Sequence, residues 1–183
     1  MDPPPPHLLP PVTLVLGGAR AGKSRHAEAM IEASGVQAAV YIATAEAGDV
    51  EMATRIAAHR ARRGGLWHTV EAPLDLGEAV AASAEPGRPI LIDCLTLWLS
   101  NLMHAGADSD EAADRLVEAL DGLPCPVVMV ANEVGLGIVP DNALAREFRD
   151  LAGRLNQRIA ARAERVVFLA AGLPLLLKER PAG

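Results

Sequence analysis

Residues 17–24 read Gly-Gly-Ala-Arg-Ala-Gly-Lys-Ser, which matches G-x-x-x-x-G-K-[ST], the pattern of phosphate-binding loops in nucleoside triphosphate enzymes. The glycines of such a loop let the backbone curl around a phosphate chain with its N–H groups pointing inward. Lys23 supplies a cation for the outer phosphates, and Ser24 offers Mg²⁺ a hydroxyl where the following helix begins, an end that favours anions. The pattern predicts nucleotide contacts from Gly17, Gly18, Ala19, Arg20, Ala21, Gly22, Lys23 and Ser24.

The residues on either side of this loop supply the context that the pattern requires. An apolar run typical of a β-strand occupies residues 12–16, and residues 25–31 have the composition of a helix. A chance match to the pattern is much rarer when a strand precedes it and a helix follows it. The region therefore predicts a strand, a phosphate loop and a helix in succession.

Short apolar runs alternate with helical stretches along the rest of the chain. Strands are predicted at 12–16, 39–43, 89–93, 126–131 and 166–171, with a further short strand near 68–71. Helices are predicted at about 23–33, 49–63, 75–84, 94–104, 109–121 and 141–164. This order indicates an α/β fold, a P-loop NTPase-like three-layer sandwich with a mostly parallel central sheet. Ligands of such folds bind at the carboxyl ends of the strands.

Composition narrows the class of protein. The chain has 183 residues, half of them hydrophobic, which suits one catalytic domain over residues 12–183 behind a disordered proline-rich tail at 1–11. Aromatic residues make up only 3% and the net charge is −6, so a nucleic-acid surface is not expected. No apolar run reaches the length of a membrane span, and the start does not resemble a signal peptide. Two separated cysteines, Cys94 and Cys125, suggest a reduced, cytoplasmic protein.

A second nucleotide signal is the apolar strand that ends in Asp93. In P-loop enzymes an acid at this place holds Mg²⁺, directly or through water, opposite the loop serine. Asp93 and Ser24 are therefore the predicted metal ligands. The alternative is that Asp93 caps the helix that begins at Cys94.

Residues 49–63 have an unusual pattern for a kinase. At helical spacing Arg55, His59 and Arg62 or Arg63 fall on one face, which places an imidazole in a row of guanidinium groups. Such a row can grip a triphosphate, and a neutral imidazole is a competent nucleophile toward phosphorus. Neighbouring arginines also disfavour the protonated imidazole. The alternative is a solvated basic helix end with an incidental histidine, and spacing does not decide between the two.

Several phrases together carry a family resemblance. They lie at 17–28, 41–45, 55–60, 67–74, 93–98 and 132–140, the last reading Asn-Glu-Val-Gly-Leu-Gly-Ile-Val-Pro. The chain resembles, over nearly all of residues 12–178, the bifunctional adenosylcobinamide kinase / adenosylcobinamide-phosphate guanylyltransferase family of cobalamin biosynthesis. The resemblance implies that ATP or GTP phosphorylates adenosylcobinamide and that GTP then donates GMP, through a histidine, to the adenosylcobinamide phosphate. The products are adenosylcobinamide-GDP and pyrophosphate, and the family is known as homotrimers.

The resemblance also assigns roles to individual residues. The guanylylated histidine falls on His59, which with Lys23 forms the predicted catalytic pair. Beyond the loop, the family's nucleotide contacts fall on Ala43, Thr44, Ala45, Arg60, Ala61, Arg62, Arg63, Glu71 and Asp93. Glu71 would accept hydrogen bonds from guanine, or it is a surface acid near a strand end.

Two other functions fit the loop. One is a P-loop small-molecule kinase in which His59 is a bystander, and the other is a nucleotide-sensing switch that catalyses nothing. The phrase at 132–140 leaves two roles open for Glu133. It assists the corrinoid hydroxyl or contacts a neighbouring subunit, or it belongs to a polar turn that uses the freedom of Gly135 and Gly137.

Overall fold

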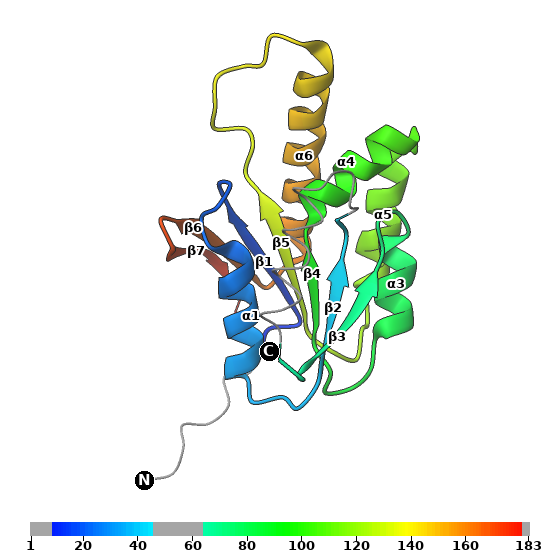
Figure 1. Ribbon diagram of the computed structural model, residues 1–183, viewed down its shortest axis with the longest axis vertical. Coiled ribbons are helices and arrows are strands. Elements are labelled where there is room, and N and C mark those ends of the chain that lie inside the picture. The colour runs from blue at the N-terminus through cyan, green and yellow to red at the C-terminus, as the bar shows by residue number, and fades with distance from the viewer. Residues whose placement is uncertain (1–8, 46–63, 181–183) are drawn as a thin grey trace.

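The computed structural model describes residues 9–45 and 64–180, which form a seven-stranded sheet between helices on its two faces (Figure 1). The elements are, in chain order, β1 (Val12–Gly17), α1 (Lys23–Ala33), β2 (Ala39–Ala43), β3 (Trp67–Glu71), α3 (Leu76–Ser83), β4 (Ile90–Asp93), α4 (Leu95–Ala105), α5 (Ser109–Ala119), β5 (Val127–Asn132), α6 (Ala143–Arg162), β6 (Arg165–Ala170) and β7 (Leu173–Glu179).

The sheet order places the phosphate loop at its centre. The strands run in the order β3-β2-β4-β5-β1-β6-β7, and all pairs are parallel except β6 with β7. At the end of β1, Gly17 is in register with Asn132 of β5 on one side and with Leu169 of β6 on the other. The loop that follows therefore leaves the sheet at its carboxyl edge, between two strands made from the second half of the chain.

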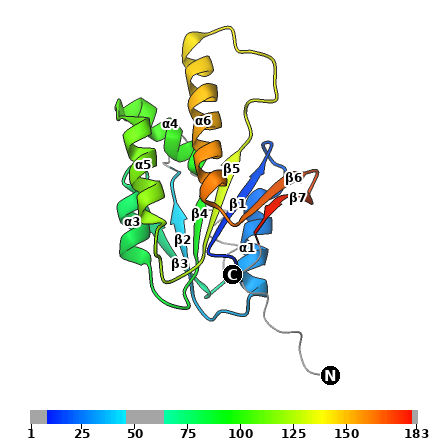
Figure 2. The same ribbon diagram turned by 180° about the vertical axis from the view of Figure 1, so that it is seen from behind.

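Both faces of the sheet are covered at its centre, which explains why β1, β2, β4 and β5 are buried along almost their whole length. In β1, Leu14 and Leu16 pack into the core beneath α3, α4, α5 and α6, while Val15 packs with residues of α1 on the opposite face. Figures 1 and 2 show α1 alone on one face and the other four described helices on the other. The predicted three-layer arrangement is confirmed.

Polar residues at the helix ends fix where the helices begin and end. The Asp108 side chain caps α5 by accepting the N–H groups of Asp110 and Glu111, both at 3.0 Å. The Asn142 side chain caps α6 by accepting the Ala145 N–H at 2.7 Å. Gly106 ends α4 in the left-handed conformation that glycine adopts without strain.

Most predicted elements lie within two residues of the observed ones, including the short strand near 68–71. The prediction missed β7, which pairs antiparallel with β6 through a turn at Ala171 and Gly172, both with positive φ. The predicted helix at 49–63 and most of the predicted tail at 1–11 lie outside the described residues, so the division into tail and catalytic domain stays a prediction. No helix in the described ranges is long and apolar enough to cross a membrane.

Candidate nucleotide site

The loop at 17–24 is held in shape by β6 and the turn after it. A Cβ at Gly17 would lie 2.4 Å from the carbonyl oxygen of Leu169, so no other residue fits there without moving the backbone. Gly22 caps α1 with φ +97°, a conformation that side chains rarely adopt. The Gly172 N–H donates to the Ala21 carbonyl at 3.1 Å, so the β6–β7 turn supports the loop directly.

Lys23 opens α1 and reaches back over the loop. Its ammonium donates to the Gly18 carbonyl at 2.6 Å, and the residue is 7% exposed. Burial lowers the pKa of Lys23 from its usual value, while the nearby Cys94 and Asp93 raise it in part. Phosphate oxygens beside this ammonium would favour its charged form and replace the hydrogen bond to Gly18.

Asp93 stands at the carboxyl end of β4, two strands from β1. Its Oδ2 accepts a hydrogen bond of 2.6 Å from the Tyr41 hydroxyl, which β2 presents from the neighbouring strand. The N-cap of α4 is Cys94, so the helix-cap alternative for Asp93 is not what the structure shows. The carboxylate is held at the edge of the sheet on the side of Lys23, where the metal prediction needs it.

The end of β2 is held beside Asp93 by hydrogen bonds from two side chains to the backbone. The Thr44 hydroxyl donates to the Cys94 carbonyl and accepts the Cys94 N–H, both at 2.8 Å. The Asn101 amide donates to the carbonyls of Thr44 at 2.7 Å and Pro73 at 3.1 Å. Ala43, Thr44 and Ala45 therefore line the same edge as the loop, with the Thr44 side chain used to hold β2 and β4 together.

The structure brings only some of the predicted residues together. The loop residues, Ala43 to Ala45 and Asp93 follow or end parallel strands at the same carboxyl edge of the sheet, with β5 between β4 and β1. Glu71 ends β3 opposite Ala43 and is exposed, farther along the same edge. The remaining predicted residues, His59, Arg60, Ala61, Arg62 and Arg63, lie outside the described residues, as does Arg55.

The turn after β5 is hydrogen-bonded to the start of the phosphate loop. The Glu133 N–H donates to the Gly17 carbonyl at 3.1 Å, and the Glu133 carboxylate accepts the Gly135 N–H at 2.6 Å. These contacts match the polar-turn alternative for Glu133. Thr96 and Asn156 hold the start of the turn, since the Thr96 hydroxyl accepts the Asn132 N–H at 2.7 Å and the Asn156 amide donates to the Asn132 carbonyl at 3.3 Å.

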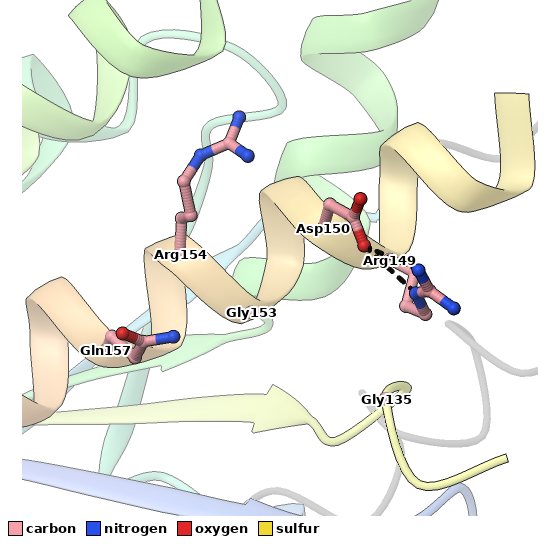
Figure 3. Close-up of a pocket in the computed structure, with 6 residues that line it drawn as sticks. All are labelled: Gly135, Arg149, Asp150, Gly153, Arg154 and Gln157. Atoms are coloured by element: carbon pink, nitrogen blue, oxygen red, sulfur yellow. Dashed lines mark hydrogen bonds and ion pairs between the residues drawn. The ribbon is translucent and has the colours of Figure 1, made fainter. Parts of the chain in front are cut away.

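A hollow of about 380 Å³ opens between this turn and α6 (Figure 3). Polar side chains and two glycines line it, namely Gly135, Arg149, Asp150, Gly153, Arg154 and Gln157. The turn leads on to exposed apolar side chains, with Leu136 80% and Ile138 98% exposed. Gly135 at the hollow lies two residues after Glu133, whose N–H donates to the Gly17 carbonyl.

Sequence reasoning missed three residues that support the site. Tyr41 donates a hydrogen bond to Asp93, and Thr96 accepts one from the last residue of β5, where the turn starts. Asn101 donates to the carbonyls of Thr44, after β2, and Pro73, after β3. Only Tyr41 carried a signal, since a lone tyrosine in an apolar strand requires a partner for its hydroxyl. The partner is Asp93 because β2 lies beside β4 in the sheet, and the sequence did not predict this strand order.

The Tyr41→Phe variant tests whether the hydroxyl positions Asp93. Because Asp93 is predicted to hold Mg²⁺, loss of this hydrogen bond should raise the Mg²⁺ concentration for half-maximal activity about tenfold. The ring keeps its edge-to-face packing on Trp67, with centroids 5.9 Å apart, so the melting temperature should change little. A Mg²⁺ activation curve that matches that of the unmodified protein would show that Asp93 needs no such support.

Comparison with known proteins gives one consistent result. The family model described as "Cobinamide kinase / cobinamide phosphate guanyltransferase" matches residues 13–177. The chain is 52% identical over 170 residues to the "Bifunctional adenosylcobalamin biosynthesis protein CobP" of Pseudomonas aeruginosa, covering 92% of this chain and 98% of the relative. It is 43% identical over 180 residues to the corresponding protein CobU of Salmonella typhimurium, covering 90% and 98%.

Solved structures agree with the fold. The assembled ATPase EscN of the enteropathogenic E. coli type III secretion system is similar with a TM-score of 0.60. At 8% sequence identity, over 93% of this chain and 50% of that one, the likeness concerns the fold alone. It supports the P-loop NTPase-like architecture predicted from residues 17–24.

Proposed function

The chain belongs to the cobinamide kinase / cobinamide phosphate guanyltransferase family, and from that premise we propose how its site carries out two transfers. It is a bifunctional kinase and guanylyltransferase of cobalamin biosynthesis, which phosphorylates adenosylcobinamide and then converts the phosphate to adenosylcobinamide-GDP. The observation that carries the proposal is the phosphate loop with Lys23 folded over it, at the same edge of the sheet as Asp93.

In the kinase step the aminopropanol hydroxyl of adenosylcobinamide attacks the γ-phosphorus of ATP or GTP, and the nucleoside diphosphate leaves. The loop backbone N–H groups and Lys23 hold the phosphates and offset the charge that moves to the leaving group. The loop is braced on both sides by β5 and β6, so it needs little rearrangement when the nucleotide binds. Positioning and charge stabilisation are the main requirements of this chemistry.

In the guanylyl step we assign the nucleophile to His59. Its imidazole nitrogen forms a bond to the α-phosphorus of GTP while pyrophosphate leaves, and a phosphate oxygen of adenosylcobinamide phosphate then displaces the histidine. The support is the sequence pattern of 55–63 and the family resemblance. The described residues that precede this segment end at Ala45, and the Thr44 N–H donates to the Asp93 carbonyl at 3.2 Å.

Ser24 and Asp93 would hold Mg²⁺ at this site. A serine hydroxyl and a carboxylate are hard oxygen ligands of the kind that Mg²⁺ takes together with substrate phosphates. Among the described residues, no group of three His, Cys, Asp or Glu side chains gathers to hold a metal, which agrees with ligands shared with the nucleotide. When bound, the ion neutralises phosphate charge in both steps.

We propose a homotrimer, as the resemblance implies, and a cytoplasmic location. The edge strand β7 exposes Leu173 and Leu175 at 72% and 59%, apolar surface that an assembly would cover. Both cysteines are free and buried, as is usual in a reducing compartment. Light scattering on the purified protein should give three times the 19.2 kDa chain mass, and the Leu173→Lys, Leu175→Lys double variant should lower that mass.

Product analysis tests the function as a whole. The protein, Mg²⁺, GTP and adenosylcobinamide should yield adenosylcobinamide phosphate first, followed by adenosylcobinamide-GDP and pyrophosphate. Accumulation of the phosphate alone would favour the plain kinase, and binding of GTP with no corrinoid product would favour the nucleotide-sensing switch. Omission of the corrinoid is the control, because neither corrinoid product can then form.

A further inference from the structure

The body of the corrinoid must rest on the edge of the sheet that holds the phosphate loop. The kinase step places the aminopropanol hydroxyl at the γ-phosphate, and this arm is short compared with the corrin ring that carries it. The ring therefore lies beside the loop and needs a surface there. This constraint rests on the proposed function.

The turn that borders the hollow starts at a strand end hydrogen-bonded to the start of the phosphate loop. Asn132 is in register with Gly17, and the Glu133 N–H donates to the Gly17 carbonyl at 3.1 Å. Two residues later Gly135 lines the hollow, facing the stretch of α6 that carries Gly153 (Figure 3).

The guanidinium groups at the hollow lie near carboxylates and do not stand alone. Arg149 is paired with Asp150 at 2.9 Å, and Arg154 lies 3.9 Å from Asp110. The lining residues thus include two guanidinium groups, the Asp150 carboxylate and the Gln157 amide, which together offer both donors and acceptors. Neutral primary amides require this combination, and primary amides surround the rim of a corrin ring.

The turn adds apolar surface beside these polar groups. Leu136, Ile138 and Val139, which follow Gly135 in the chain, are 80%, 98% and 62% exposed. A corrinoid has this same division, with an apolar ring face inside a rim of amides. A nucleotide, by contrast, would gain little from three exposed aliphatic side chains beside paired charges.

Gly153 keeps the hollow open. It lies inside α6, where glycine is the least favourable residue after proline, yet a Cβ built there meets nothing within 4 Å. Close packing therefore does not require glycine at this position. Its neighbours on the same face of the helix, Asp150 and Gln157, both line the hollow.

We propose that this hollow receives one amide-bearing edge of the corrinoid and that the exposed apolar turn lies against the ring face. Gly153 and Gln157 are then specificity-determining residues for the corrinoid and not for the nucleotide. The volume of about 380 Å³ suits part of the ring's rim and not the whole molecule.

The Gly153→Phe variant fills the hollow and tests the proposal, with Gly153→Ala as its matched control. Phenylalanine should raise the KM for adenosylcobinamide at least about tenfold, while the KM for GTP and the labelling of the protein by GTP stay unchanged. Alanine adds one methyl group in open space, so it should change that KM less than about twofold and raise the melting temperature. Gln157→Ala, at an exposed position, should raise the same KM about fivefold through the loss of one hydrogen bond.

Direct titration with adenosylcobinamide separates this proposal from the proposed function. If the unmodified protein binds the corrinoid but makes no phosphate, the function fails while the Gly153→Phe titration still decides the hollow. If a folded Gly153→Phe variant binds the corrinoid as tightly as the unmodified protein, the proposal is wrong. If that variant keeps its corrinoid affinity but changes its oligomeric mass, the hollow belongs to a contact between subunits. If Gly153→Phe does not fold, unchanged affinity in Gln157→Ala overturns the proposal.

Discussion

The Lys23→Ala variant should lose both activities, with the rate of each transfer falling at least about a hundredfold. The physical reason is that one buried ammonium serves the same phosphate loop in both steps. Lys23 is 7% exposed and its ammonium reaches the Gly18 carbonyl at 2.6 Å, so its removal takes a charge directly from the phosphate loop. Initial rates with adenosylcobinamide plus ATP, and with adenosylcobinamide phosphate plus GTP, measure the two steps separately.

Lys178→Ala is the matched control for this experiment. Lys178 is the only other lysine in the chain, and its ammonium donates to the Ala160 carbonyl at 2.7 Å near the end of α6, away from the loop. That variant should keep both activities. If the kinase step survived Lys23→Ala at its normal rate, the chain would have to contain a second nucleotide site, and the proposal of one shared loop would be wrong.

His59→Ala should abolish the guanylyl transfer and spare the phosphorylation of adenosylcobinamide by ATP. GTP labelled on the α-phosphorus should leave a covalent label on the unmodified protein that is labile in acid and stable in alkali, as a phosphoramidate is. The variant should carry no label, a loss of more than about a hundredfold, because the nucleophile itself is gone. Denaturing electrophoresis after brief incubation with GTP and Mg²⁺ measures it.

His68→Ala controls for the loss of a histidine. His68 lies on β3 and is exposed, and no role is proposed for it. That variant should label at the normal level. Full labelling of His59→Ala would assign the nucleophile to another residue, and failure of the unmodified protein to label at all would leave the plain kinase as the better description.

The centre of the fold could be predicted from the sequence because its signals are local. The loop pattern fixes a strand before it and a helix after it, and β1 and α1 are observed there. Buried parallel strands are apolar on both faces, so runs such as 39–43 and 126–131 stand out from the helices between them. These features depend on residues that are neighbours in the chain.

The parts that could not be predicted depend on contacts between distant residues. β7 was missed because its turn is Ala171-Gly172 and not one of the usual hairpin pairs, and because leucine and proline at 173–177 do not favour a strand. The Tyr41–Asp93 hydrogen bond joins residues 52 positions apart and requires β2 to lie beside β4. The site assignments for His59 and the arginines after it stay predictions because these residues lie outside those that the structure describes.

The position of β1 between β5 and β6 bears on how the protein matures during synthesis. A ribosome makes the phosphate loop within the first 24 residues, but the strands that flank β1 come from residues 127–132 and 165–170, and the supporting turn follows them. A nascent chain in which β6 has not yet been synthesised contains the loop sequence but lacks one of the two strands that flank β1. Nucleotide binding is therefore acquired only after β5, β6 and the turn at Ala171 and Gly172 have been synthesised.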